Sequence, residues 1–357
     1  MKSKGFISLA LVAAAGIAFY VWRDSAAPTD GAKAASVPSS AEVSRGSAGS
    51  GVIGARAGAP GIAPSASNRA TPAKLTLSGE LAVARSYKAI YDRLANSPEG
   101  QTAEGQYVQY RILRACATIS DRRGPAVRQG MDLTPQREFI GTLPDTDPSK
   151  AKRVAALDQL SEDKCVGLTG IVTTEADLAK RLGEAAAAGS PSARILQVEQ
   201  ELWQERRASG SRTGPTLTDN QVDSLRNAIG TGDPEALVLA GRVLGTSFRD
   251  VTLRLGPDPT PVEGRALSNA FTLMACDHGY PCGDNNPRIL QACAFQGHCD
   301  AGNLPDFLAY YQTSPYEQQL QLQYRGVLNN AITTRDWSGL TIQRGTAPLP
   351  PYPPARR

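Results

Sequence analysis

The feature that most constrains the fold of this chain is a duplicated pair of cysteines near its C-terminal end. The spacing is C-x5-C-x10-C-x5-C, and the four residues are Cys276, Cys282, Cys293 and Cys299. Each pair encloses a glycine, so each second cysteine falls where the chain is expected to fold back over a helix end. This duplication favours the disulfides Cys276–Cys282 and Cys293–Cys299, while the spacing alone leaves the other two pairings open.

Two further cysteines bring the total to six, an even number that fits three disulfides. Cys116 and Cys165 are expected on or beside separate helices, and they would then pair across a long loop. Disulfides persist in oxidising compartments and are rare in the cytosol. The cysteines therefore favour a domain outside the cytosol, in which their role is to stabilise the fold.

The N-terminus carries an apolar leader. A run of about 18 residues extends from Gly5 to Trp22, which is near the lower limit for a helix that spans a bilayer. Lys2 and Lys4 precede the run, and basic residues at this position keep the N-terminus in the cytoplasm while the remainder is exported. The run ends in aromatic residues, as is typical of a membrane interface.

We therefore interpret residues 1–23 as a transmembrane anchor, with residues 5–22 in the inner membrane, rather than as a cleaved signal sequence. The expected location is a bacterial inner membrane, crossed once, with the C-terminal domain in the periplasm. The alternative is a secreted or periplasmic protein whose leader has been removed. Both interpretations place the domain outside the cytosol.

Composition divides the rest of the chain. Residues 24–75 are rich in Ala, Gly, Ser and Pro without a helical period, so we expect a disordered linker. Residues 341–357 are expected to form a disordered tail, because they contain a proline-rich run of polyproline II type. Residues 76–340 are expected to form a helical domain, with possible subdomains 76–165 and 166–340.

Helix signals dominate this domain. A short polar residue followed by proline recurs, and such a pair starts a helix well because proline needs no hydrogen-bond partner in the first turn. The pairs are Asp147-Pro148, Ser190-Pro191, Asp233-Pro234, Asn286-Pro287 and Ser314-Pro315. Capping boxes are also expected from Thr218 to Gln221 and from Ser314 to Glu317.

Apolar residues also recur at helical rather than alternating periods. The expected helices cover 79–95, 103–118, 148–161, 175–188, 191–207, 219–230, 234–245, 262–277, 287–296, 304–312 and 315–334. Segments 120–146 and 247–260 are predicted to be long loops, and no strand is expected. The predicted fold class is all-α, as a helical-hairpin, solenoid-like array stapled by disulfides and preceded by the membrane helix and the linker.

Two segments 43 residues apart match each other. They are Ala185-x3-Gly189-Ser190-Pro191 and Ala228-x3-Gly232-Asp233-Pro234. Each contains a helix that ends at glycine, a capping residue, a proline and a second helix. A period of this length is typical of two-helix repeats.

The repeat resembles the Sel1-like family, which is related to the tetratricopeptide repeats. The segment from Leu178 to Gly189 is most similar to the alanine-rich helix and glycine turn of that family, and the segment from Ala275 to Cys282 is similar to its cysteine-rich secreted members. The resemblance covers about residues 175–300, without the usual Leu-Gly-x-x-Tyr of the first helix. It implies a protein-interaction scaffold with local disulfides and without catalytic residues.

A metal site is the alternative interpretation of the cysteine-rich segment. Both histidines of the chain, His278 and His298, lie within it. Zinc favours four cysteine and histidine ligands, which here would come from Cys276, His278, Cys282, Cys293, His298 and Cys299. The C-x2-C spacing of common zinc modules is absent and an oxidising compartment competes for the thiols, so disulfides are favoured and no cofactor is expected.

Sequence motifs of catalysis are absent. H-E-x-x-H, G-x-S-x-G and the phosphate-binding P-loop do not occur. Pairs of acids could serve a peptidoglycan hydrolase, and the candidates are Glu199 with Glu201, Asp258 with Glu263, and Asp300 with Asp306. A net charge of +4 without a basic patch argues against nucleic acid as a partner. The expected function is a tethered interaction or scaffolding module with a protein partner in the envelope; a cell-envelope enzyme and a metal-binding protein are the alternatives.

Overall fold

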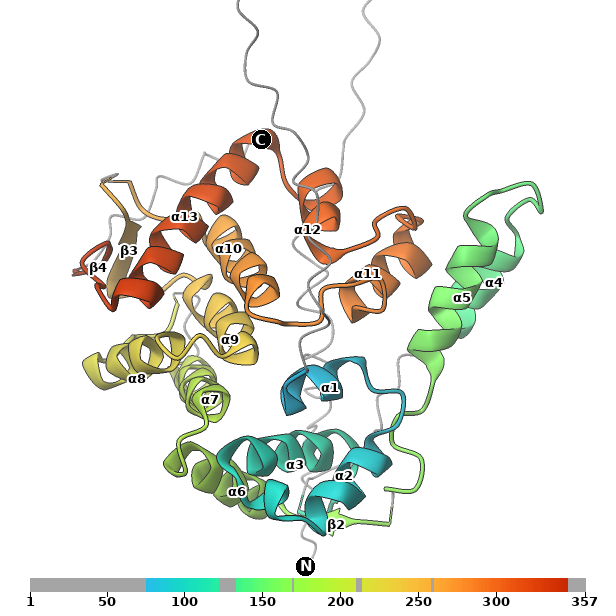
Figure 1. Cartoon of the computed structure of the whole chain (residues 1–357), viewed down its shortest axis with the longest axis horizontal. Helices are drawn as coiled ribbons and strands as arrows, with labels where there is room; N and C mark the ends of the chain where they lie inside the picture. The colour runs from blue at the N-terminus through green and yellow to red at the C-terminus, as the bar shows by residue number, and fades with distance from the viewer. Residues whose placement is uncertain (1–74, 122–132, 169, 210–213, 258–259, 346–357) are drawn as a thin grey trace, which may run out of the picture. The chain divides into compact units, whose positions relative to one another are not determined.

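Helices form most of the part of the chain that the structure describes (Figure 1). The structure is a computed structural model, and it describes residues 75–121, 133–168, 170–209, 214–257 and 260–345. The α-helices are α1 (Leu77–Val83), α2 (Tyr87–Ala95), α3 (Ala103–Cys116), α4 (Thr134–Gly141), α5 (Lys150–Ser161), α6 (Glu175–Ala187), α7 (Pro191–Ser209), α8 (Asp219–Ile229), α9 (Pro234–Leu244), α10 (Gly264–Asp277), α11 (Pro287–Gln291), α12 (Leu304–Phe307) and α13 (Pro315–Thr334).

Short helical segments of other types extend this set. A 3-10 helix, η2 (Pro98–Gln101), precedes α3, and two π-helical turns, η3 (Ala292–Gln296) and η4 (Leu308–Gln312), continue α11 and α12. Four of the five expected polar–proline pairs start helices, namely those before α7, α9, α11 and α13. The fifth does not, because α5 begins at Lys150 behind Ser149.

The capping chemistry of the sequence is confirmed where it was predicted. Thr218 and Ser314 each accept a hydrogen bond from the backbone three residues ahead, and the side chain at that position bonds back to the cap, which closes both capping boxes. A third box at Thr174 and Asp177 was not predicted. Because these hydrogen bonds join residues only three positions apart, the local sequence is sufficient to predict where these helices begin.

The two matching segments share a left-handed glycine between two helices, although α8 ends one residue earlier relative to its glycine than α6 does. Gly189 and Gly232 lie in the turns that follow helices α6 and α8, with φ angles of 104° and 70°, a left-handed conformation that glycine adopts without steric cost. The segments also contact each other, since Ser192 Oγ donates to Asp233 Oδ1 at 2.8 Å. Helix α7 packs against α6, α8 and α9, so the two helix pairs lie side by side.

The first predicted helix, 79–95, is wrong as a single element. Ala84 is extended between α1 and α2, and the N–H of Tyr87 donates to the carbonyl of Lys164 at 2.8 Å instead of continuing the first helix. The predicted loop 120–146 is also wrong in part, because it contains α4. This helix buries Ile140 against α5, and that packing partner lies beyond the segment itself.

Two small sheets correct the expectation that strands are absent. Strand β3 (Val251–Leu255) lies in the predicted loop 247–260 and pairs antiparallel with β4 (Leu340–Arg344). Its residues alternate between buried and partly buried, the period-2 signal that the sequence interpretation missed. Strands β1 (Thr118–Ile119) and β2 (Val172–Thr173) form a short parallel pair.

One large hydrophobic cluster runs from Leu77 in α1 to Leu340 in β4. Helix α10 is central to it and packs against both α9 and α13 (Figure 1). The hairpin of α4 and α5 belongs to a separate cluster, in which Leu157 and Ile140 pack with Ala294 of η3. A stretch that begins at Leu133 is thus held by residues more than a hundred positions later.

The structure tests the predicted C-terminal boundary of the domain but does not describe most of the segment before its N-terminal boundary. Strand β4 runs through the expected boundary between residues 340 and 341, because pairing with β3 satisfies its backbone. The leader 1–23 and all but one residue of the linker 24–75 lie outside the described residues. Within the described residues no helix has the length and apolar character needed to cross a membrane.

Candidate functional site

The six cysteines form the three disulfides that the sequence favours. These are Cys116–Cys165, Cys276–Cys282 and Cys293–Cys299. The first joins the end of α3 to the segment before β2, and the chain between its two cysteines contains α4 and α5. The other two each fold the chain back over a helix end, at α10 and at η3.

These bonds occupy the cysteines on which the zinc alternative depends. With no free cysteine, the six ligands proposed for it offer no thiolate. The two histidines also have other surroundings: His278 lies beside Gly232, where a Cβ would be 3.1 Å from its ring, and His298 stacks on Tyr311 with ring centroids 4.2 Å apart. No group of three potential ligands occurs among the described residues.

The acids singled out in the sequence serve separate structural contacts. Glu199 pairs with Arg242 at 2.6 Å, and Glu201 accepts from Gln221 at 2.9 Å. Asp300 pairs with Lys152 at 2.9 Å.

Three more acids complete this set. Glu263 caps α10, and Asp306 accepts from Asn303 Nδ2 at 2.8 Å. Asp258 lies outside the described residues. No described pair of these candidates is brought together by the structure through a shared hydrogen bond or ion pair.

A buried ion pair was not anticipated from the sequence. Arg111 Nη1 of α3 lies 2.5 Å from Glu235 Oε1 at the start of α9, and the Glu235 residue is only 5% exposed. The arginine side chain retains 34% exposure, so the pair is reached by solvent from one side only. The signal in the sequence is the single acid in the otherwise apolar run after Pro234.

Tyrosines surround this ion pair. The Arg111 guanidinium lies 6.0 Å from the centroid of the Tyr107 ring, which is buried. Burial raises the pKa of Tyr280 to about 12, and the charges of Glu235 and Arg111 act on it in opposite directions. Burial likewise raises the pKa of the Glu235 carboxyl, against the lowering effect of Arg111. The ion pair joins α3 to α9, and the Glu235 carboxylate has its partner within the protein.

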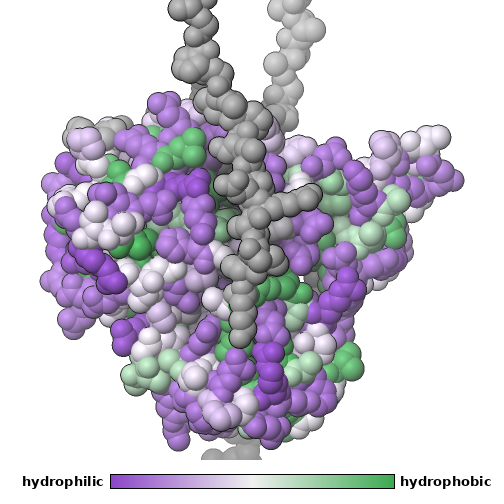
Figure 2. Space-filling view, viewed as in Figure 1, coloured by the Kyte–Doolittle hydropathy of each residue, from purple (hydrophilic) through white to green (hydrophobic). Residues whose placement is uncertain are grey.

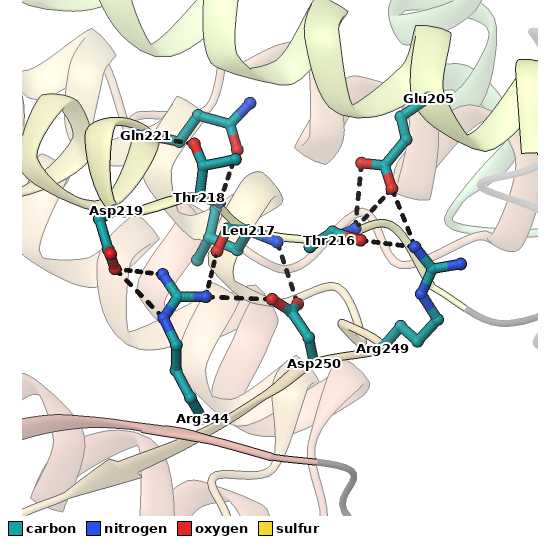
Figure 3. A network of polar contacts seen from close by, with 9 residues as sticks. All are labelled: Glu205, Thr216, Leu217, Thr218, Asp219, Gln221, Arg249, Asp250 and Arg344. Carbon is teal, nitrogen blue, oxygen red and sulfur yellow. Dashed lines mark hydrogen bonds and ion pairs between the residues drawn. The ribbon is translucent and has the colours of Figure 1, made fainter.

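A second polar network holds β4 against the beginning of α8 (Figure 3). Arg344 donates to Asp219 at 3.1 Å, to the carbonyl of Leu217 at 2.6 Å and to Asp250 at 3.0 Å. Asp250 in turn accepts from the N–H of Leu217 at 3.0 Å. Arg344 therefore links the last strand to two segments that precede it by about a hundred residues.

The other end of this network connects α7 with the same segment. Glu205 accepts from the N–H of Thr216 at 3.1 Å, and Arg249 donates to Glu205 at 3.2 Å and to Thr216 at 2.6 Å (Figure 3). All these side chains have partners within the chain, so the network stabilises the fold rather than offering free groups to a ligand.

Replacing Arg344 by alanine is expected to loosen β4. The guanidinium is exposed to solvent, so the free energy of unfolding should fall only slightly. Hydrogen exchange should show the effect more clearly, as faster exchange of the amides of β3 and β4 and unchanged exchange in α3. The control R137A removes an exposed ion pair on α4 and should leave β4 protected. Equal protection of β4 in both variants would contradict the role assigned to Arg344.

Three exposed tyrosines lie in η4 and at the start of α13. Tyr310 is 78% exposed, Tyr316 68% and Tyr311 39%. We call these three residues the tyrosine patch. Stacking on His298 and a ring contact with Phe307 at 6.1 Å hold Tyr311 in place. Rings of this size present a large contact area at a low cost in conformational entropy.

Two hollows on the described part of the chain are small. A hollow of about 140 Å³ lies between α6 and α7, lined by Leu182 and Gln200 among others. Another of about 100 Å³ lies beside η2, lined by Gln109 and Arg181 among others. Drug-sized ligands occupy pockets of roughly 300–1,000 Å³. On the face shown in Figure 2, hydrophobic residues form separate patches between hydrophilic ones.

Comparison with known proteins gives no match to a family model, to a curated protein or to a solved structure.

Proposed function

We propose that this protein is an interaction module of the cell envelope, which binds a protein partner through the tyrosine patch. The exposure of Tyr310, Tyr311 and Tyr316 carries this proposal. Exposed tyrosines are enriched among the residues that contribute most to protein–protein binding, because the ring is buried on binding and the hydroxyl finds a polar partner. Single exposed apolar residues are normal on a protein surface, but here three exposed tyrosines occur within seven positions.

The fixed position of Tyr311 supports this proposal. Tyr311 is fixed by the ring of His298, whose backbone lies within the loop closed by Cys293–Cys299. The patch also includes η4, and π-helical turns occur frequently at functional sites. A side chain that is ordered before binding loses less entropy in the complex.

The expected setting of this module follows from the leader and the disulfides. We propose a single-pass anchor in the inner membrane, with the helical domain in the periplasm on a flexible linker; export followed by cleavage is the alternative. The helix pairs α6–α7 and α8–α9 would be two repeats of a solenoid-like array of Sel1-like type. Their matched glycine turns and the contact between Ser192 and Asp233 support this assignment.

A photoreactive residue at position 310 or 316 of the full chain tests the proposed function. In intact envelopes we expect each position to give a covalent adduct of one discrete mass, and the double substitution Y310A/Y316A to reduce adduct formation from position 311 at least ten-fold. Position 322 is the matched control, because Leu322 is 51% exposed on α13 and lies outside the patch. Both tyrosines are exposed, so the double substitution should change the free energy of unfolding by less than about 1 kcal/mol. The absence of adducts at 310 and 316, or equal adducts at 322, would contradict the proposal.

A further inference from the structure

The C-terminal end of α7 presents an aromatic ring and two guanidinium groups on one side of the helix. Trp203, Arg206 and Arg207 follow the spacing i, i+3 and i+4, which places residues on a common face. Trp203 is 47% exposed, and the guanidinium of Arg206 lies 6.0 Å from the centroid of its ring. We call these three residues the α7 basic face.

The acidic side chains of α7 do not neutralise this face. Glu199 pairs with Arg242 of α9, Glu201 accepts from Gln221 of α8, and Glu205 binds Thr216 and Arg249. Neither Arg206 nor Arg207 forms an ion pair with another described residue. The acids of helix α7 thus bind neighbouring segments, whereas Arg207 is exposed and Arg206 is half-buried near the Trp203 ring.

The helix dipole is one explanation for positively charged residues at the end of α7. Arg206 and Arg207 lie in the last turn of α7, where positive charge is favoured by the helix dipole. That effect accounts for the arginines but not for an exposed tryptophan on the same face. Tryptophan beside arginine is instead the combination found where proteins meet the interface of a bilayer, with the indole at the level of the headgroups and the cations near anionic lipids.

We propose that the α7 basic face binds the surface of a bilayer that contains anionic lipids. Two guanidinium groups without ion-pair partners complement the charge of lipid phosphates, and the Trp203 indole can enter the interface. This binding goes beyond the protein interaction proposed above and uses residues outside the tyrosine patch. Each basic residue near an anionic surface contributes about five-fold in partitioning, so the contact is weak and reversible. A membrane tether would raise the effective lipid concentration and make such a weak contact sufficient.

Fluorescence of Trp203 in the full chain tests this proposal. The chain is mixed with vesicles whose acyl chains are brominated, made either of phosphatidylcholine alone or with added phosphatidylglycerol. The chain has three tryptophans, so the contribution of Trp203 is taken as the difference between the natural chain and W203F. We expect quenching of this contribution only with phosphatidylglycerol, and its loss at high salt, which screens exposed charges.

Two variants of equal net charge distinguish specific binding by the α7 basic face from general electrostatic attraction of the chain to the vesicles. R206Q/R207Q should weaken the quenching about 25-fold in lipid titrations, given five-fold for each basic residue. R137Q/K152Q also removes two positive charges, but from the α4–α5 hairpin, and should leave the quenching unchanged. Equal losses in the two variants would overturn the proposal.

Sedimentation of the vesicles distinguishes this proposal from that of the membrane anchor. If the chain sediments with both lipid mixtures while Trp203 remains unquenched, the leader anchors the chain and the α7 basic face does not bind lipid. If the chain neither sediments nor shows quenching, both proposals are overturned. An acidic protein that binds this face in the absence of any lipid response would also contradict the lipid assignment.

Discussion

Replacing Cys116 and Cys165 together by alanine is expected to lower the free energy of unfolding by about 4 kcal/mol. The two cysteines are 49 positions apart, and closing a loop of this length removes much of the conformational freedom of the unfolded chain. Typical domains are stable by roughly 5–15 kcal/mol, so this loss is a large fraction of the total. Urea denaturation of the non-reduced variant and of the natural chain measures it.

The two short disulfides provide the comparison. Cys276–Cys282 and Cys293–Cys299 each join residues six positions apart, so the same loop-entropy relation gives about 2 kcal/mol for either one. The variant C276A/C282A should therefore be destabilised about half as much as C116A/C165A. Equal or inverted losses would show that the long disulfide does not act mainly by restricting the unfolded chain.

Replacing Arg111 by methionine is expected to destabilise the protein by about 3 kcal/mol at neutral pH. Glu235 is 5% exposed, and removal of its partner leaves a buried carboxylate without a compensating charge. The control R114M removes an arginine on the same helix whose pair with Glu175 is exposed on both sides, and it should cost less than about 1 kcal/mol. The double variant R111M/E235L should recover most of the loss, since neither charge remains buried.

The pH dependence of R111M follows from the same carboxyl. Burial raises the pKa of Glu235 in the folded protein, and Arg111 opposes that shift, so the pKa should rise further without Arg111. Between the unfolded and the raised folded pKa, the folded protein holds a proton that the unfolded chain has lost. Stability therefore falls as the pH rises through this window, and it is retained below the unfolded value of about 4.3. Urea denaturation at pH 4 and pH 7 should show the smaller loss at pH 4; the same loss at both would contradict this account.

Helix starts and the disulfides could be predicted because their determinants are close in sequence. The pairs Ser190-Pro191 and Asp233-Pro234 carry their own capping groups, and the turns at Gly189 and Gly232 need only glycine. The duplicated C-x5-C units close within six positions, where few geometries are open to the chain. The Cys116–Cys165 pairing then followed from the number of cysteines that remained.

The missed elements depend on partners far along the chain. Helix α4 is stabilised by packing on α5 and η3, and Gln136 donates to the carbonyl of Ala294 at 3.0 Å. Strand β3 had the alternating pattern of a strand, but its partner β4 lies about 90 residues later, in a stretch interpreted partly as tail. Neither pattern alone showed that a partner was present.

For the candidate sites too, the sequence showed where residues lie along the chain but not which of them are exposed or paired. The proline pair at Ser314 showed where α13 begins, and so where Tyr316 lies, but not that the neighbouring tyrosines are exposed. The spacing of Trp203, Arg206 and Arg207 was visible in the sequence. What the sequence did not show is that the acids of α7 are occupied by other segments.

By itself the sequence determined the helical character of residues 76–340 and most helix starts, and it favoured the observed disulfides without excluding other pairings, because hydrogen bonds, caps and short loops act between near neighbours. Only the tertiary structure decided where the α4–α5 hairpin packs, which strands pair, and that Arg111 meets Glu235 across 124 positions. Those contacts depend on which surfaces the whole chain brings together, and burial of a charge or exposure of a ring is a property of that arrangement rather than of the residue.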